Sequence, residues 1–494
     1  MPAILTTATG LNCNAMKTQK LTHKGFKGLS NVTPYNSTNS QGVASPELAY
    51  LKSAINVDID NAGVIVSRPG FMRIYAGKVH SLWSNGKICL FRHGDTLKQL
   101  FMHPSYSSEE TPPVTQGVAP YDVRTLASGI AGNLRMSYQY IAGRVYFSDA
   151  ATTGVVDFTE ATIPVVRSWG IVPPNPPLLS ESKGALPSGN YQVALTYQRS
   201  DGQESGASAF SSIAITRGGI DIVCPLATVG SGQSNDSLDN GIRKMNVYVT
   251  TANGEVPYLV ASVDNTSKSL STSMPGYASP LSYRGETGRG QVLSTWGLKP
   301  PPPGQLLSYY RGRLYVASHN TLWYSLPFAY ELFDMAQGWM VFDLPITLVA
   351  AVNDGILVGT SEEVVFLQGV EPEKFQMRHL SSCGAVFGTQ AHGLLPGSDN
   401  AGDSEVVFWE SKKGKCAGLS GGKIEFLAND GYSYETGEAG AGIYWQRDGM
   451  QLYLSVMEGT PRPPVNTHRS IIVTNDADTG NYSLTMPPLS LNSY

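Results

Sequence analysis

The residues most suited to binding a metal ion lie in the stretch NVDIDNAGVIVSRPG, residues 56–70. Its first part, Asp58 to Gly63, begins like a calcium loop, in which oxygen ligands alternate over twelve residues and the last ligand is a glutamate. Ala62 stands at the fifth position and Pro69 at the twelfth, so two side-chain ligands of such a loop are missing. The stretch is therefore a poor candidate for a calcium site.

The same stretch fits a β-hairpin. Apolar residues recur at every second position on both sides of a short turn, namely at Ile55, Val57, Ile59, Val64 and Val66. A period of two is typical of a strand, and Asn61 and Gly63 adopt the positive φ angles of tight turns at little cost. We predict a hairpin that ends at Arg68-Pro69-Gly70, without metal binding at Asp58 or Asp60.

No other pattern of residues points to catalysis. The eight histidines lack metal-ligand spacing, and no nucleophile elbow or phosphate-binding loop occurs. Glu109-Glu110 and Glu362-Glu363 are adjacent pairs, which face opposite sides if they lie in strands. A glycosidase needs two carboxylates that face each other, and the sequence does not exclude a pair that comes from distant elements. We predict no catalytic, cofactor-binding or metal-ligating residue, and no enzyme activity.

Composition favours many short strands that are joined by turns. The 494 residues include 52 glycines, 31 prolines and 25 tyrosines, and only 15% are charged, against about a quarter in typical proteins. The formal net charge of −4 does not favour tight binding to nucleic acid. Five scattered cysteines without a C-x-x-C pair favour free thiols in a reducing compartment. We expect neither a signal peptide nor a membrane-spanning helix.

A short phrase recurs along the chain and predicts repeated hairpins. It consists of a glycine, a basic residue and alternating apolar or aromatic residues, as in Gly143-Arg144-Val145-Tyr146-Phe147. It also begins at Gly77, Gly86, Gly312 and Gly422, and looser versions begin at Gly355 and Gly449. We predict turns at His319-Asn320 and at Asp201-Gly202. Strand-turn-strand units that repeat over a long chain favour a β-propeller, here of about six to eight blades.

Two proline-rich segments interrupt this series, at residues 172–177 and 299–304, and they predict the domain boundaries. Between them, alternating apolar residues indicate an inserted β-sandwich. We predict an extended N-terminal arm over 1–45, a first part of the propeller over 46–168, the inserted sandwich over 169–299 and a second part of the propeller over 300–494. The arm carries the basic residues Lys17, Lys20, Lys24 and Lys27. The arm is either solvated or becomes ordered on a neighbouring subunit, and we predict that these lysines contact a neighbouring protein.

The motifs resemble one family. NVDIDNAGVIVSRPG, after the upstream GFKGLSNVTP, resembles the start of nozzle proteins of short-tailed bacteriophages, also called tail tubular protein B or packaged-DNA stabilisation proteins. The segment SGNYQVALTYQRSDGQESGAS resembles the fibronectin type III domains of phage tail proteins. The resemblance covers about a third of the chain and implies an all-β propeller interrupted by a fibronectin-III-like sandwich.

The resemblance also implies a function. The expected assembly is a homohexameric ring in the virion tail, assembled in the cytoplasm of the host bacterium. It would bind the head-to-tail adaptor and tail fibre, spike or tail-tip proteins, retain packaged DNA and conduct it during ejection. The glycine-rich segment around Gly437, Gly440 and Gly442 is interpreted as a flexible loop and a candidate channel loop. The alternatives are a receptor-binding or glycan-cleaving tail protein, and another hub or fibre-attachment component.

Overall fold

The computed structural model describes most of the chain between its ends. The described residues are 26–29, 49–51, 54–55, 57–59, 64–68, 73–102, 121–159, 163–227, 241–265, 271, 273–274, 276–285, 290–395, 404–427, 436–447, 450–458, 472–475 and 482–485. These residues form strands and turns, with one short 3₁₀ turn at Pro372–Lys374. The predicted all-β class is confirmed.

Six antiparallel sheets follow one another along the chain as blades. Blade 1 has the strands β6 (His80–Ser84), β7 (Cys89–His93), β8 (Thr96–Met102) and β9 (Tyr121–Ala127). Blade 2 has β10 (Ser137–Ile141), β11 (Arg144–Ser148), β12 (Thr153–Asp157) and β13 (Val165–Arg167). Blade 3 has β22 (Leu306–Tyr310), β23 (Arg313–Ser318), β24 (Thr321–Leu326) and β26 (Trp339–Val341), with β25 (Ala329–Asp334) joined to β24 and β21 (Leu298–Lys299) joined to β25.

The last three blades continue this order. Blade 4 has β27 (Ile346–Val352), β28 (Gly355–Thr360), β29 (Val364–Gln368) and β30 (Gln376–Ser381). Blade 5 has β31 (Ala391–Leu395), β32 (Ser404–Ser411), β33 (Gly414–Leu419) and β34 (Lys423–Phe426). Blade 6 has β35 (Gly440–Arg447) and β36 (Met450–Met457). Six sheets in series agree with the lower end of the predicted blade count.

Apolar clusters fill the spaces between successive blades. Leu97 of blade 1 packs with Phe147 of blade 2, and Val155 of blade 2 packs with Val316 of blade 3. Further clusters join blade 3 to blade 4, blade 4 to blade 5 and blade 5 to blade 6. Face-to-face packing of four-stranded meanders in chain order is the architecture of a β-propeller.

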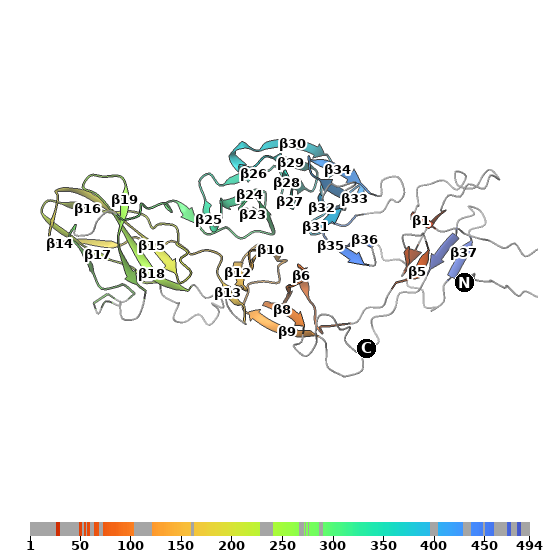
Figure 1. Ribbon diagram of the computed structural model, residues 1–494, viewed down its shortest axis with the longest axis horizontal. Coiled ribbons are helices and arrows are strands. Elements are labelled where there is room, and N and C mark those ends of the chain that lie inside the picture. Colours follow the sequence, from red (N-terminus) through yellow and green to blue (C-terminus); the bar gives the residue numbers. More distant parts are fainter. Residues whose placement is uncertain are drawn as a thin grey trace, which may run out of the picture.

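The inserted domain is a seven-stranded sandwich. One sheet has β14 (Leu178–Leu186), β17 (Gly218–Val223) and β20 (Leu281–Tyr283), and the other has β16 (Ser211–Ile215), β15 (Gly189–Arg199), β18 (Ile242–Thr250) and β19 (Pro257–Asp264). Inward-facing residues such as Val193, Leu195 and Ile220 are fully buried between the sheets. The predicted fold class, a propeller interrupted by an inserted fibronectin-III-like sandwich, is confirmed, and Figure 1 shows the sandwich beyond the edge of the blades.

The remaining described strands form small sheets from both ends of the chain. β1 (Phe26–Leu29) pairs in parallel with β2 (Ala49–Leu51), and β4 (Val57–Ile59) pairs with β5 (Ile65–Ser67). β3 (Ala54–Ile55) pairs in parallel with β38 (Tyr482–Thr485), which pairs with β37 (Ile472–Asn475). These strands lie at the end of the molecule opposite the sandwich (Figure 1). β1 falls in the range expected to be an extended arm, and β2–β5, β37 and β38 fall in the ranges expected for the propeller.

The recurrent glycine phrase marks turns that precede strands, as predicted. Gly143 has a φ of 86° and lies directly before β11, and Gly312 has a φ of 78° and lies directly before β23. Glycine adopts this left-handed conformation without the steric cost of a Cβ atom. The predicted turn at His319-Asn320 is also present, because Ser318 pairs with Thr321 between β23 and β24.

Candidate functional site

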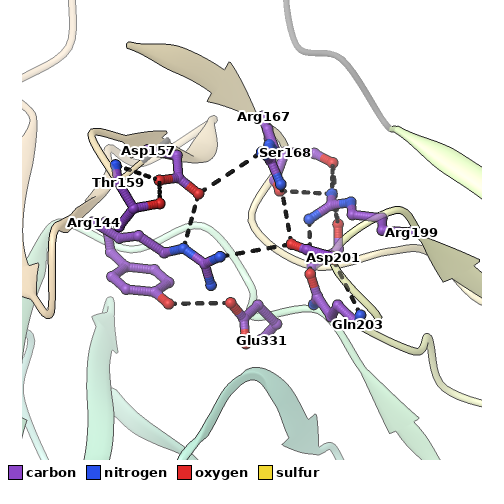
Figure 2. Close-up of polar contacts among 11 residues, drawn as sticks. Arg144, Asp157, Thr159, Arg167, Ser168, Arg199, Asp201, Gln203 and Glu331 are labelled. Carbon is purple, nitrogen blue, oxygen red and sulfur yellow. Dashed lines mark hydrogen bonds and ion pairs between the residues drawn. The ribbon is translucent and has the colours of Figure 1, made fainter. Parts of the chain in front are cut away.

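A network of polar contacts lies where the sandwich joins the propeller, and we call it the joint (Figure 2). It contains Arg144, Asp157, Thr159, Arg167, Ser168, Arg199, Asp201, Gln203 and Glu331. These residues come from blade 2, from the linker that enters the sandwich, from the first hairpin of the sandwich and from β25 of blade 3. The joint therefore connects three parts of the fold that are distant in sequence.

Two arginines and two aspartates alternate at the joint. Arg144 Nε lies 2.9 Å from Asp157 Oδ2, and Arg167 Nη1 lies 3.0 Å from Asp201 Oδ2. The crossed contacts, from Arg144 Nη2 to Asp201 and from Arg167 Nη2 to Asp157, are both 3.8 Å. Since Asp201 belongs to the sandwich and the other three residues belong to blade 2, this network links the two domains.

Asp157 is the most buried member of this network, with 5% of its side chain exposed. Burial alone would raise the pKa of its carboxyl, but the hydrogen bonds from Thr159 and the charge of Arg144 outweigh burial and hold that pKa below its ordinary value. The Thr159 backbone N–H and hydroxyl donate to Asp157 Oδ1 at 2.9 and 2.5 Å. The carboxylate is thus ionised and fixed in place near neutral pH.

Arg199 fixes the sandwich to the entering linker. Its Nη2 donates to the Ser168 carbonyl at 2.9 Å, to the Ser168 hydroxyl at 2.8 Å and to the Gly170 carbonyl at 3.0 Å. Its Nη1 donates to Gln203 Oε1 at 2.8 Å. The residue is 5% exposed, so the planar guanidinium has exchanged water for four fixed acceptors.

The linker itself is anchored by Trp169, which is 1% exposed. Its Nε1 donates to the Tyr330 carbonyl at 2.8 Å, and its ring lies 5.2 Å from the ring of Tyr146 and 6.1 Å from that of Phe333. Tyr146 in turn donates to Glu331 Oε1 at 3.1 Å. Burial raises the pKa of the Glu331 carboxyl. Blades 2 and 3 therefore hold the linker between them.

Permanently charged arginines on paired carboxylates have no reactive group to offer. What this arrangement can do is resist bending between the sandwich and the propeller. Sequence reasoning missed its members, although Arg144 lies in the recurrent glycine phrase and Asp201 was expected in a turn. Their partnership depends on contacts between remote positions, such as the 57 positions between Arg144 and Asp201 and the 185 positions between Tyr146 and Glu331, and no local pattern reports it.

The predicted hairpin at Asp58 is confirmed. β4 and β5 are antiparallel, and Asp58 lies opposite Val66. The turn residues between them lie outside the described residues. Within the described part of the chain, no three His, Cys, Asp or Glu side chains gather where they could hold a metal ion. Likewise, no helix in that part is long and apolar enough to cross a membrane.

The interpretation of the glycine-rich segment as a flexible loop is wrong for two of its glycines. Gly440 and Gly442 lie in β35, opposite Met457 and Ser455 of β36. A Cβ atom on Gly442 would lie 2.0 Å from the carbonyl oxygen of Thr389, so close packing explains this glycine better than flexibility. Gly437 lies before the strand, where a Cβ would meet the Glu458 carbonyl at 1.8 Å. The role of these glycines in a channel stays a prediction.

Most basic residues of the N-terminal arm lie outside the part of the chain that the structure describes. Lys17, Lys20 and Lys24 lie outside the described residues, and Lys27 lies in β1. Their predicted contact with a neighbouring protein stays a prediction. The carboxylate pair Glu109-Glu110 also lies outside the described residues.

Glu362 and Glu363 differ from the expectation for a strand pair. They lie in the turn between β28 and β29, and both line a hollow of about 660 Å³ together with Asp343, His379 and Lys412. Glu363 Oε2 is 3.5 Å from His379 Nε2. The turn, which does not alternate its side chains as a strand does, explains why adjacent residues share one hollow.

Comparison with known proteins identifies no family. No family model and no curated protein matches the sequence. Among solved structures, the chain is similar to BBS1N in a crystal structure of its complex with ARL6DN, soaked with lead, at 8% identity and a TM-score of 0.29, with 84% of this chain and 94% of that chain covered. It is also similar to Sqt1 of Saccharomyces cerevisiae, at 10% identity and a TM-score of 0.18, with 67% and 91% covered. Scores this low carry no argument about function.

Proposed function

We propose that this chain is a structural subunit of the tail nozzle of a short-tailed bacteriophage. In this proposal identical copies, six in number if the family resemblance holds, form a ring below the head-to-tail adaptor. The ring retains packaged double-stranded DNA and conducts it during ejection without sequence-specific binding. Tail fibre, spike or tail-tip proteins attach to it, and the ring assembles in the cytoplasm of the host bacterium.

The observation that carries the proposal is the joint between the propeller and the sandwich. A conduit wall has to keep its shape while DNA moves past it. The joint opposes bending through the Arg167–Asp201 ion pair, through the four hydrogen bonds of Arg199 and through the buried ring of Trp169. The family named in this proposal comes from the resemblance of residues 56–70 to nozzle proteins.

The packing of the blades explains why the proposal requires a ring of copies. Apolar clusters occupy the spaces between successive blades, for example around Phe366 and Trp409, which are 0% and 1% exposed. The proposal places the passage for a DNA duplex between copies of the chain. Symmetry then places identical residues around one axis. A net charge of −4 on each copy limits adhesion of DNA to the wall.

The decisive experiment is cryo-electron microscopy of the intact virion, with this chain located in the density below the adaptor. Particles made without the protein are expected to package the genome and then lose it, or to lack the lower tail. The outcome that contradicts the proposal is a virion without the protein that retains its DNA and stays infectious. The same map measures ring stoichiometry, which distinguishes a nozzle from a hub or a fibre-attachment component.

One observation favours a second candidate, a tail protein that cleaves host glycans. The hollow lined by Asp343, Glu362 and Glu363 brings carboxylates from two turns to one surface, and His379 lies beside them. Purified protein is incubated with host surface polysaccharide, and reducing ends are measured. Hydrolysis that disappears in Glu363→Gln and persists in Glu425→Gln, an exposed carboxylate on β34, would favour this candidate. No hydrolysis by the parent protein would remove it.

A further inference from the structure

The last blade is attached firmly to blade 5. The rings of Tyr444 and Tyr453 stack on Phe408 of β32 at centroid distances of 5.8 and 5.4 Å. The Tyr453 hydroxyl donates to the Thr389 carbonyl at 2.7 Å. These contacts occupy the face of blade 6 that carries Tyr444 and Tyr453, which are directly opposite each other in the β35–β36 ladder.

A buried carboxylate strengthens the same attachment. Glu410 of β32 is 0% exposed and lies 2.5 Å from Lys415 Nζ of β33. The hydroxyl of Ser455, on β36, donates to Glu410 Oε1, and Lys415 Nζ donates to that hydroxyl at 2.6 Å. Removal of one partner from such an ion pair is strongly destabilising, because the remaining charge is left without compensation in a buried position. Blade 6 therefore moves with blade 5.

The opposite face of blade 6 is apolar and exposed. Ile443 is 55% exposed and Leu454 is 45% exposed, and the two lie opposite each other on this face. Val456, on the same face, is 74% exposed. This face points away from blade 5, toward the place that blade 1 takes in a closed ring, and Leu82 on β6 of blade 1 is 67% exposed. We call the boundary between blades 6 and 1 the closing seam.

The closing seam is packed differently from the other boundaries between blades. Each of the five boundaries from blade 1 to blade 6 in chain order has a buried apolar cluster. Among the residues that the structure describes, no such cluster joins β35 and β36 to β6–β9. Apolar burial is the main source of attachment between blades, so this boundary is the weakest of the six.

One arginine reaches across from the first two blades to the last two. Arg135 lies in the segment between β9 and β10, and its Nη2 donates to the carbonyl of Gly388, before β31, at 2.6 Å. Its Nη1 donates to the carbonyl of Gly440 at the start of β35. Its guanidinium lies 5.4 Å from the centre of the Phe387 ring. The contacts join blades that are 253 and 305 positions apart in sequence.

The segment that carries Arg135 is held rigidly from within blade 1. Arg92 is 0% exposed and pairs with the equally buried Asp149 at 2.8 Å. The same guanidinium donates to the carbonyls of Gly132 at 2.6 Å and Leu134 at 3.0 Å. Arg135 is therefore presented by a fixed support, and its two bonds do not require the ordering of a loose segment.

We propose that Arg135 is the clasp that closes the propeller, and that the ring opens at the closing seam when the clasp is released. Blade 6 then separates from blades 1 and 2 while it stays attached to blade 5. The reason is the unequal attachment of blade 6: stacked rings and the hydrogen bond from Ser455 to the buried Glu410 hold it to blade 5, whereas the hydrogen bond from Arg135 to the Gly440 carbonyl connects it to the segment between blades 1 and 2. The proposal concerns a single chain and does not depend on the proposed tail function.

Hydrogen exchange of the full chain tests the clasp. In the parent protein, amides of β35 and β36 are expected to exchange faster than those of β28, which lies in the middle of blade 4. In Arg135→Gln, exchange in β35 and β36 is expected to rise by about tenfold or more, because hydrogen bonds of a charged donor are lost. β28 is expected to stay unchanged. Arg135→Lys keeps the charge without the planar fork and is expected to give a smaller rise.

Arg311→Gln is the matched control. Arg311 Nη2 donates to the Asn353 carbonyl at 2.9 Å, between blades 3 and 4, whose boundary has a buried apolar cluster. Its loss is expected to leave exchange in β35 and β36 unchanged. Equal exchange in Arg135→Gln and the parent protein would overturn the clasp. The clasp would also be overturned if amides in β35 and β36 of the parent protein exchanged no faster than those in β28. This second comparison does not depend on the folding of any variant.

Discussion

The joint and the closing seam both connect parts of the chain that are distant in sequence, but by different means. At the joint, Arg144 and Arg167 meet carboxylates, and Trp169 is buried between two blades. At the closing seam, Arg135 donates to two backbone carbonyls and lies over the Phe387 ring, and Ile443 and Val456 of blade 6 are exposed. We infer that burial and opposite charge make the joint permanent. The hydrogen bonds of Arg135 and the exposed apolar face of blade 6 make the closing seam reversible.

The difference also separates two ways of interrupting a propeller. Gly170 and Pro300, at the two boundaries of the sandwich, are 130 positions apart in the sequence, yet these boundaries lie together. A Cβ atom on Gly170, whose φ is 86°, would lie 3.0 Å from Pro300 Cβ and 2.9 Å from the Glu331 carbonyl. The insertion thus leaves blades 2 and 3 in contact. The two ends of the series of blades are connected by the hydrogen bonds of Arg135 and, beyond the blades, by the pairing of β3 with β38. Within the blades, our proposal assigns closure to Arg135.

The largest expected effect is that of Trp169→Ala at the joint. The substitution removes a buried ring and the hydrogen bond to the Tyr330 carbonyl, and substitutions of this kind cost about 3 to 5 kcal/mol of unfolding free energy. Chemical denaturation measures the loss. The matched control is Trp296→Ala, since that ring is 64% exposed and stacks on Phe210. Equal losses in the two variants would mean that the joint is not held by burial.

A double-mutant cycle tests whether charge pairing crosses the joint. Arg167→Gln, Asp201→Asn and the double variant are expected to give a coupling of about 1 kcal/mol, between the values for exposed and buried pairs. The side chains are 17% and 18% exposed, which places the pair between those classes. The same cycle on Lys374 and Glu371, an exposed pair within one turn, serves as control and is expected to give no measurable coupling. A vanishing coupling at the joint would reduce its ion pairs to surface contacts.

The fold was more predictable from sequence than the joint was. The turn before β11 and the turn at His319 are local, because a glycine or a hairpin geometry fixes a few neighbouring residues, and these were predicted correctly. Gly442 was misinterpreted because its requirement comes from Thr389, more than fifty positions away. The partners of Asp201 are 34 and 57 positions away, and those of Arg135 are 253 and 305 positions away. Short sequence patterns report local conformational preference, but they do not report tertiary pairing.

Glu331→Gln gives a pH-dependent effect at the joint. The folded-state pKa of Glu331 is raised by burial, so the ionised carboxylate destabilises the fold at pH values above that pKa. As the pH falls through the raised pKa, the folded protein binds a proton and this destabilisation is lost. Glutamine keeps an acceptor for the Tyr146 hydroxyl and carries no charge.

The variant is therefore expected to be more stable than the parent near neutral pH, and the difference is expected to shrink as the pH falls toward the ordinary carboxyl range of about 4. Thermal unfolding from pH 4 to 8 measures it. Glu405→Gln, on β32 and away from the joint, is the control. A variant that is less stable at pH 7, or a difference that grows at low pH, would show that the Glu331 charge supports the joint through Arg144.

The smallest expected effect is at the closing seam. Val456 is 74% exposed, so Val456→Ser is expected to change the free energy of unfolding by less than about 0.5 kcal/mol, as surface substitutions do. Val155→Ser at the joint is the matched control, because Val155 is 6% exposed in the cluster around Trp169. Val155→Ser is expected to lower the free energy of unfolding by about 2 kcal/mol, since it buries a hydroxyl among apolar side chains. Chemical denaturation of both variants measures the contrast. A comparable loss at Val456 would mean that the face of blade 6 is covered in solution, and that the seam is held by packing as well as by the clasp.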